Sequence, residues 1–154
     1  MDLVYDVLKE EVFNQLGSHK VMVLATSTED RVTARNMSCI IMDHKLYFQT
    51  DKHFLKTEQM LMNQNVAFCV DNIQMEGVAR VIGGVDMAPE FCEAYKRYFR
   101  NSYDTYTHLI NQVVIEVEPT LITLWRYAEG RKPYRDFLDC RHKKAYREMY
   151  DISK

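Results

Sequence analysis

Three strand-like runs follow one another closely near the start of the chain, and they constrain its fold more than any other feature. The runs cover residues 21–26, 32–42 and 46–50, and two short polar turns, Glu29-Asp30 and Asp43-His44, separate them. Turns this short join neighbouring antiparallel strands, whereas parallel strands need long crossover connections. The sequence therefore predicts a meander of antiparallel hairpins and disfavours a doubly wound α/β fold.

The rest of the chain continues this pattern with a few short helices. Apolar residues at four-residue spacing predict an amphipathic helix over residues 2–16. A second helix, capped by Thr50 or Asp51, is expected at residues 54–62, and a third at about residues 89–100. Further strands are expected at residues 66–70, 75–83, 112–117 and 121–126, whereas residues 134–150 have a helical composition.

The expected fold is mainly β (α+β), an antiparallel barrel of six to seven strands with flanking helices. A length of 154 residues suits one domain, and we find no repeat or linker that would divide residues 1–154. Apolar residues make up 47% of the chain and charged residues 27%, which is typical of a globular protein and excludes a disordered one.

Charge and composition also limit the partners of the protein. The net charge of -2 gives no general reason to expect nucleic acid. No signal peptide and no apolar run of about 18 residues is found, so we expect a cytoplasmic protein without a membrane span. The four cysteines form no Cys-x-x-Cys pair and the histidines are scattered, which predicts free buried thiols and no metal site.

A strand leads directly into a helix at residues 46–56, and this junction could bind a phosphate. The first turn of a helix presents unpaired N–H groups and a partial positive charge. Thr50 adds a hydroxyl group, and Lys52 and Lys56 add two ammonium groups on one expected helix face. The same residues also fit a plain helix cap with two solvent-exposed lysines, so the residue types leave both interpretations open.

Arg35 precedes Asn36 and Met37 in a strand that is otherwise rich in apolar residues. A buried cation needs a partner, because leaving it unpaired costs several kcal/mol. The partner could be the carboxylate of Glu76 or Glu116, or it could be an anionic ligand.

The order of these motifs is more informative than any one of them. Arg-x-Met at residues 35–37 is followed by Leu-Tyr-Phe-x-Thr at residues 46–50, by a lysine six positions later and by Asn-x-x-Val at residues 63–66. Gly77 then precedes small and basic residues, and the last barrel-like strand ends at Trp125. Over roughly residues 18–126 this order resembles the pyridoxamine 5'-phosphate oxidase-like FMN-binding family.

The resemblance implies a split β-barrel that forms a homodimer, with two FMN sites at the interface between the subunits. It places Arg35, Asn36 and Met37 along the edge of the isoalloxazine ring, and it assigns the phosphate to Thr50 and Lys56, with Lys52 as a weaker third candidate. Asn72 or Gln74 would offer an amide to the flavin, and Trp125 would approach it from the second subunit.

The resemblance also implies an activity. Residues 126–135 are basic but lack the histidine with which pyridoxamine 5'-phosphate oxidases hold their substrate, so vitamin B6 oxidation is not expected. The shorter chain is closer to the stress-protein and nitroimidazole-resistance branches. This implies an oxidoreductase that takes electrons from NAD(P)H and reduces a nitro compound or a quinone. The alternative is a non-catalytic FMN- or haem-binding protein, and no residue is identified as catalytic.

Two further stretches have open interpretations. Residues 126–147 carry eight basic residues against three acidic ones, and they could contact an anionic ligand or form a solvated helix face. Five aromatic residues at positions 95–106 could line a substrate pocket, although aromatic residues at helical spacing more often belong to a core or a dimer interface.

Overall fold

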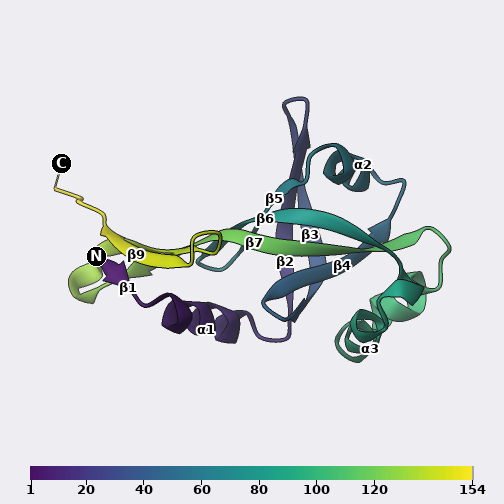
Figure 1. The fold of residues 1–154 in the computed structure, drawn as a ribbon, viewed down its shortest axis with the longest axis horizontal. Coiled ribbons are helices and arrows are strands. Elements are labelled where there is room, and N and C mark those ends of the chain that lie inside the picture. Colours follow the sequence, from purple (N-terminus) through teal and green to yellow (C-terminus); the bar gives the residue numbers. More distant parts are fainter. Residues whose placement is uncertain (154) are drawn as a thin grey trace.

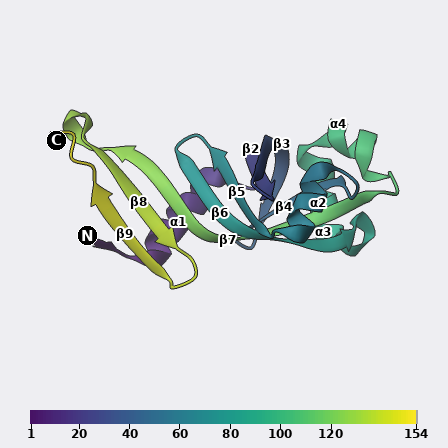
Figure 2. The same cartoon turned by 90° about the horizontal axis from the view of Figure 1, so that it is seen from above.

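A closed barrel of antiparallel strands forms one end of the molecule, and a three-stranded arm extends from it (Figures 1 and 2). The computed structural model describes residues 1–153. Its strands are β1 (Asp2–Leu3), β2 (His19–Thr28), β3 (Arg31–Met42), β4 (Lys45–Asp51), β5 (Asn65–Val70), β6 (Ile73–Gly84), β7 (Gln112–Tyr127), β8 (Pro133–Asp139) and β9 (Lys144–Met149).

The strand order is β1-β9-β8-β7-β4-β3-β2-β5-β6, and a further pairing between β6 and β7 closes the barrel. Six strands, β2 to β7, therefore form the barrel, and every pairing is antiparallel. Strands β8, β9 and β1 continue the sheet beyond the barrel as the arm. This confirms the expected fold class, a mainly β antiparallel barrel with flanking helices.

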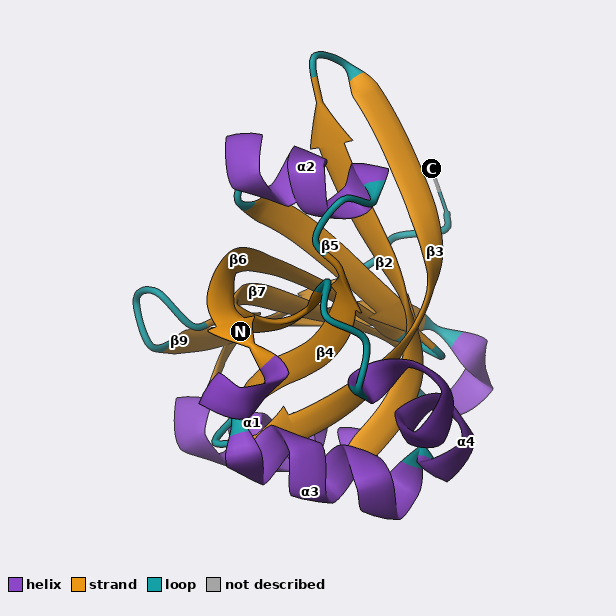
Figure 3. Ribbon diagram, turned by 90° about the vertical axis from the view of Figure 1, so that its right-hand side faces the viewer, coloured by secondary structure: helices purple, strands orange, loops and turns teal. Residues whose placement is uncertain are grey.

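The helices cover three different parts of this sheet (Figure 3). The inner faces of α1 and of the arm belong to the same core as the barrel interior. Helix α2 contacts β2 and β6, and α3 packs on the outside of the barrel against β3 and β7. The helices are α1 (Tyr5–Leu16), α2 (Leu55–Met62), α3 (Pro89–Tyr98), α4 (Arg100–Ser102), the 3-10 helices η1 (Val85–Met87) and η3 (Glu129–Arg131), and the π-helix η2 (Tyr103–Thr107).

The two predicted hairpin turns are confirmed. Glu29 and Asp30 have φ angles of 48° and 63°, and Asp43 and His44 have φ angles of 51° and 58°. Two successive residues with positive φ define the type I′ turn, whose twist matches that of the strands it joins. Aspartate and histidine adopt positive φ more readily than most residues, which fits Asp30, Asp43 and His44.

Strand β7 differs from the expectation of two strands separated by residues 118–120. It is one strand of 16 residues, and its pairing with β6 absorbs the extra residue through a register shift, since Glu76 pairs with Leu121 while Gly77 pairs with Pro119. The backbones approach closely here: a Cβ atom on Gly77 would lie 2.9 Å from the carbonyl oxygen of Glu118. A glycine is therefore required where the bulge brings β6 against β7.

The prediction of a helix at residues 134–150 is wrong, because this segment forms the hairpin of β8 and β9. The alternation of apolar and polar residues that indicates a strand is interrupted there, because a buried position is occupied by an aspartate. Asp136 is fully buried and accepts hydrogen bonds from Arg126 and Arg147, at distances between 2.7 and 3.0 Å. The basic residues of this segment therefore lie on strands and turns, and the interpretation as a solvated helix face is also wrong.

Two smaller expectations also need correction. Helix α2 begins after Phe54, and neither Thr50 nor Asp51 caps it with a side chain; Thr50 lies within β4 instead. The four cysteines are free as expected, but only Cys39 is buried. None of the helices in residues 1–153 combines the length and apolar character that crossing a membrane requires.

Candidate functional site

A groove opens where strands β3 and β4 separate. The two strands pair over only three residue pairs, from Ile40 with Tyr47 to Met42 with Lys45. From there β3 continues to Arg31 beside β2, while β4 continues to Asp51 beside β7. Between these diverging segments the facing edges have no strand partner, so backbone N–H and C=O groups remain available to a ligand.

The groove has a volume of about 200 Å³ and receives residues from both strands and from the helices on either side. Its lining combines hydroxyl, amide and aromatic side chains with a methionine, one lysine and the carboxylate of Asp51, which accepts a hydrogen bond from the backbone N–H of His53 at 2.8 Å. The lining residues are Asn36, Met37, Ser38, Gln49, Thr50, Asp51, Phe54, Lys56, Tyr95, Ser102, Tyr106 and Gln112.

Arg35 lies next to this groove and is held by neutral groups. Its guanidinium donates to the Thr26 hydroxyl at 2.8 Å, to the Thr33 hydroxyl and, more weakly, to the carbonyl oxygen of Leu24 at 3.4 Å. Both hydroxyl groups in turn donate to Oε1 of Gln59, at 2.6 and 2.8 Å. The site therefore fixes the position of the cation without neutralising its charge.

The predicted carboxylate partner of Arg35 is not found. Glu116 is instead engaged by the Tyr47 hydroxyl at 2.9 Å, by Arg80 at 3.1 Å and by Lys45 at 3.7 Å, and Glu76 is exposed on β6 without an ion pair in the described chain. Both candidates are thus wrong. Neutral acceptors, the hydroxyl groups of Thr26 and Thr33 and the carbonyl oxygen of Leu24, take the place of the expected carboxylate.

Lys56, on the first turn of α2, is the second cation of the site. Desolvation and the positive charge of Arg35 both lower the pKa of Lys56, and desolvation lowers the pKa of Arg35. Within residues 1–153 neither cation forms an ion pair. Two neighbouring cations that are partly desolvated and lack a carboxylate form a site that an anion would stabilise.

Gln49 is the residue of the groove that the sequence analysis missed. Only 6% of it is exposed, its Oε1 accepts a hydrogen bond from the Thr107 hydroxyl at 3.0 Å, and its Nε2 has no partner. A buried N–H group without an acceptor is costly and usually marks the place of a ligand or an ordered water. The groove thus offers one unsatisfied donor besides Lys56 and the neighbouring Arg35, which fits an anionic ligand with several oxygen atoms.

The structure does not bring Lys52 into this site. Lys52 is exposed and lies before α2, where its backbone N–H donates to the carbonyl oxygen of Asn111. It therefore does not share a helix face with Lys56, as the sequence had suggested.

Asn72, Gln74 and Trp125 also lie outside the groove of their own chain. Trp125 is 13 residues from Gln112 along β7, which corresponds to roughly 40 Å. Asn72 donates to the carbonyl oxygen of Trp125 at 2.9 Å and accepts from Gln15 at 2.7 Å, so its amide is already engaged. Gln74 is exposed on β6. Trp125 is 42% exposed, with the Arg135 guanidinium 5.4 Å from its ring.

The aromatic residues at positions 95–106 divide between the two roles considered for them. Tyr95 is buried in the core between α3 and the barrel, where Tyr98, Phe99 and Tyr103 also pack. Tyr95 and the half-exposed Tyr106 line the groove as well. Burial raises the pKa of Tyr95, while contacts with Ser102 and Ser38 act in the opposite direction, so its hydroxyl is a donor near neutral pH.

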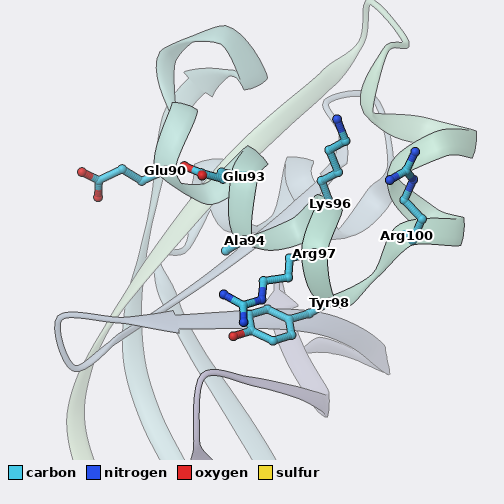
Figure 4. Close-up of a pocket in the computed structure, with 7 residues that line it drawn as sticks. All are labelled: Glu90, Glu93, Ala94, Lys96, Arg97, Tyr98 and Arg100. Atoms are coloured by element: carbon cyan, nitrogen blue, oxygen red, sulfur yellow. The ribbon is translucent and has the colours of Figure 1, made fainter.

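A larger hollow on the outer surface of α3 and α4, of about 520 Å³, has no such organisation (Figure 4). The side chains of Glu90, Lys96 and Arg100 spread away from one another into solvent, and Arg97 lies over the ring of Tyr98. We also find no group of three or more potential metal ligands in residues 1–153. The groove between β3 and β4 is therefore the better candidate site.

Comparison with known proteins agrees with this fold. Residues 8–126 match the family model for pyridoxamine 5'-phosphate oxidase. General stress protein 26 from Bacillus anthracis str. Sterne has a TM-score of 0.60 and 21% identity, and the alignment covers 82% of this chain and 96% of that one. No curated protein sequence gives a significant match.

Two further solved structures align over almost the whole chain. PhzG from Burkholderia lata 383, in complex with tetrahydrophenazine-1-carboxylic acid, has a TM-score of 0.62 and 15% identity, covering 95% of this chain and 91% of that one. A pyridoxamine 5'-phosphate oxidase-related, FMN-binding protein from Nostoc punctiforme has a TM-score of 0.61 and 12% identity, with coverage of 93% and 91%. At these identities the similarity shows a shared fold.

Proposed function

Because this chain belongs to the pyridoxamine 5'-phosphate oxidase family, we propose that its groove binds FMN and that the protein is an NAD(P)H-dependent oxidoreductase. The observation that carries the proposal is the pair of cations, Arg35 and Lys56, which have no carboxylate partner in the described chain. A phosphate beside them would receive charge-assisted hydrogen bonds and would relieve their mutual repulsion. Thr50, whose side chain is almost fully buried in the groove, adds a hydroxyl donor.

The unpaired edge of β3 supports the position of the flavin ring. Asn36 and Met37 lie on this edge and line the groove, so their backbone groups can pair with the pyrimidine part of the ring as a neighbouring strand would. The exposed ring of Phe54 and the half-exposed Tyr106 supply apolar surface on the other side. Each residue thus orients or binds, and no side chain of the groove has to act as a catalytic acid or base.

The reaction we propose is the reduction of a nitro compound or a quinone. FMN supplies its redox chemistry, because a flavin exchanges electrons both with a nicotinamide cofactor and with such an acceptor. The protein contributes the cations that hold the phosphate and the donors that face the ring.

We further propose that the functional unit is a homodimer with the flavin at its interface. The outer face of the barrel carries six small apolar residues on neighbouring strands: Val21, Val23, Ala25, Ala34, Ala67 and Cys69. Antiparallel sheets usually present polar side chains to water, whereas Val21 is 52% exposed and Cys69 is also exposed. The apolar part of this face, on β2, β3 and β5, is typical of an interface core that a second copy would cover symmetrically, and the exposed Glu76, which pairs with Ala67, marks its border on β6.

The same face connects the groove with Gln74. Asn36 pairs with Val23, Val23 with Cys69, and Cys69 with Gln74, so the four side chains form one row across the outer face. In a symmetric dimer this row would bring Gln74 of one chain toward the groove of the other. Gln74 is a better donor to the flavin than Asn72, whose amide is already engaged by Trp125 and Gln15.

The cofactor is tested first by the absorption spectrum of the purified protein. A flavin spectrum, or quenching of FMN fluorescence on titration, supports the proposal, and a Soret band would favour haem instead. Anaerobic stopped-flow reduction of the FMN-loaded protein by NADH and by NADPH then tests the activity. Reduction by either donor, followed by reoxidation with a nitroaromatic compound or a quinone, is expected. Failure with both donors would leave a flavin-binding protein without the proposed activity.

The dimer is tested by light scattering after size-exclusion chromatography. Val23→Glu places a charge in the middle of the apolar face and is expected to give monomers that bind FMN more weakly. Val7→Glu serves as the control, because Val7 is 65% exposed on α1 and lies outside this face. A wild-type protein that elutes as a monomer, or a Val23→Glu variant that remains dimeric, would contradict the proposed interface.

A further inference from the structure

We propose that Gln49 is an additional ligand of the flavin, donating from Nε2 to an oxygen of its ribityl phosphate chain, and that Thr107 orients it. This inference rests on the proposed binding of FMN and assigns a role to a residue on the opposite wall of the groove from Lys56. Gln49 points outward from the barrel wall beneath η2, because the adjacent Phe48 points into the barrel core and side chains alternate along a strand.

The first observation that supports this role is the burial of Gln49. Nε2 is buried and has no hydrogen-bond partner in the described chain, although Gln49 lines the groove. Leaving an amide N–H group unpaired in a buried position costs free energy that a plain structural residue would avoid. An oxygen-bearing ligand in the groove removes this cost, because it supplies the missing acceptor.

A second buried glutamine in the same protein shows what a purely structural arrangement looks like. Oε1 of Gln59 accepts from the hydroxyl groups of Thr26 and Thr33, and its Nε2 donates to the carbonyl oxygen of Arg31 at 3.2 Å. Both ends of that side chain are therefore satisfied within the protein. Gln49 is satisfied at Oε1 only, so the two glutamines differ at the one atom that faces a ligand site.

In the structure the contact with Thr107 engages Oε1 of Gln49 and leaves Nε2 without a partner. Thr107 donates its hydroxyl proton to Oε1 at 3.0 Å, and only 6% of Thr107 is exposed. With Oε1 held there, Nε2 is the end of the amide that has no partner within the described chain, and Gln49 lines the groove. Thr107 is thus a positioning residue, since it acts on the ligand only through Gln49.

The location of Thr107 in a π-helix links the groove to an unusual local structure. The π-helix η2 (Tyr103–Thr107) follows α4, and an Arg100–Asp104 ion pair and a hydrogen bond from Thr105 to the carbonyl oxygen of Asn101 support its first turn. π-Helical turns are rare and frequently occur at functional sites. In this protein the turn brings Thr107 over β4, 58 residues away in the sequence.

The inference is tested by titrating wild type and variants with FMN and with lumiflavin, which has the ring but not the ribityl phosphate. Gln49→Met keeps the length of the side chain and removes the donor, and Gln49→Glu keeps the shape and adds a negative charge. Thr107→Val removes the hydroxyl group, whereas Thr107→Ser retains it. Thr123→Val is the matched control, because Thr123 is buried to the same extent on β7 but does not line the groove.

Gln49→Met is expected to weaken FMN binding about tenfold, equivalent to ~1.4 kcal/mol, and to leave lumiflavin binding unchanged. Gln49→Glu should weaken FMN binding more, because it also repels the phosphate. Thr107→Val should show a smaller loss that Thr107→Ser rescues, and Thr123→Val should match the wild type. The FMN-induced rise in melting temperature should shrink in the same order, which provides a readout independent of activity.

The outcomes separate this inference from the proposed function. If the wild type binds FMN and Gln49→Met binds it equally well, Gln49 is not a ligand, although FMN binding stands. If Gln49→Met loses FMN and lumiflavin by the same factor, the substitution has disturbed the groove and the assignment to the ribityl phosphate chain is wrong. If the wild type binds no FMN, both proposals are overturned.

Discussion

Replacement of Lys56 by methionine should weaken the binding of FMN and, at the same time, stabilise the ligand-free protein. The ammonium group of Lys56 lies 5.0 Å from the centre of the Phe54 ring and forms no ion pair in the described chain, whereas Arg35 is anchored by Thr26 and Thr33. A hydrogen bond to a charged group contributes ~1.5–3 kcal/mol. Its loss should therefore raise the Kd for FMN roughly 10- to 150-fold, while riboflavin, which lacks the phosphate, should bind as before.

The stabilisation follows from the repulsion between the two cations. Arg35 lowers the pKa of Lys56, which means that the charged form of Lys56 is disfavoured in the folded protein. Neighbouring like charges on the surface of a helix destabilise by ~0.2–0.5 kcal/mol, and we take this as the order of magnitude for Arg35 and Lys56. Relieving this repulsion should raise the melting temperature of the ligand-free protein by roughly 0.4–2 °C, given about 2–4 °C per kcal/mol for a chain of this size.

Fluorescence titration with FMN and riboflavin, together with thermal unfolding in the absence of flavin, measures both effects. Lys52→Met is the matched control, because Lys52 lies four residues away but outside the groove. It should alter neither affinity nor melting temperature. Equal losses of FMN and riboflavin in Lys56→Met, or a loss of FMN in Lys52→Met as large as in Lys56→Met, would refute the assignment of the phosphate to Lys56.

Three further substitutions and one control test the strands that support the groove, and the stability of each variant is measured by thermal unfolding. Asp136→Asn should lower the free energy of unfolding by about 3–5 kcal/mol, because it leaves two arginines without their buried carboxylate. The control Asp139→Asn, at a more exposed pair, should lower it by less than ~1 kcal/mol. Burial alone would raise the pKa of Glu116, but its hydrogen bonds and the nearby cations lower it below 4.5. Wild type should therefore lose its stability advantage over Glu116→Gln as the pH falls below that value, and an advantage constant from pH 7 to pH 3 would contradict this. Gly77→Ala should cost ~1–3 kcal/mol, since the added methyl group meets the Glu118 carbonyl at 2.9 Å; an unchanged melting temperature would show that the bulge can widen.

Local signals predicted the hairpins well, because a turn is determined by adjacent residues. Glu29-Asp30 and Asp43-His44 carry the positive φ angles that a two-residue turn needs. The arm was missed for the opposite reason. Asp136 occupies an inward position of β8, beside the buried Leu138, and it can be buried only because Arg126 and Arg147 meet it from neighbouring strands. A carboxylate at a core position interrupts the apolar alternation by which a strand is predicted, so this strand could not be predicted without knowing those two partners.

The candidate site likewise combines residues that local sequence motifs predicted with one residue whose burial depends on a segment far away in the sequence. The structure brings Asn36, Met37, Thr50 and Lys56 into one groove, and each had a recognisable motif in the sequence. Gln49 had none, because it stands at an outward position of β4 and would be exposed on an isolated hairpin. Its burial depends on the π-helix that follows α4, and no pattern near residue 49 predicts that contact.

The single long strand β7 also determines the order in which the protein can fold. It pairs with β4 and with β6 to close the barrel, and it starts the arm through β8. During synthesis, β2 to β6 are complete before residues 112–127 emerge, so the nascent sheet has free edges at β4 and β6 until then. Closure must then join segments that are far apart in the sequence, which is a slow kind of step and leaves apolar surface open to aggregation. Conditions that delay or weaken β7 should therefore reduce the yield of folded protein more than equal changes in α1 or in the hairpin of β8 and β9.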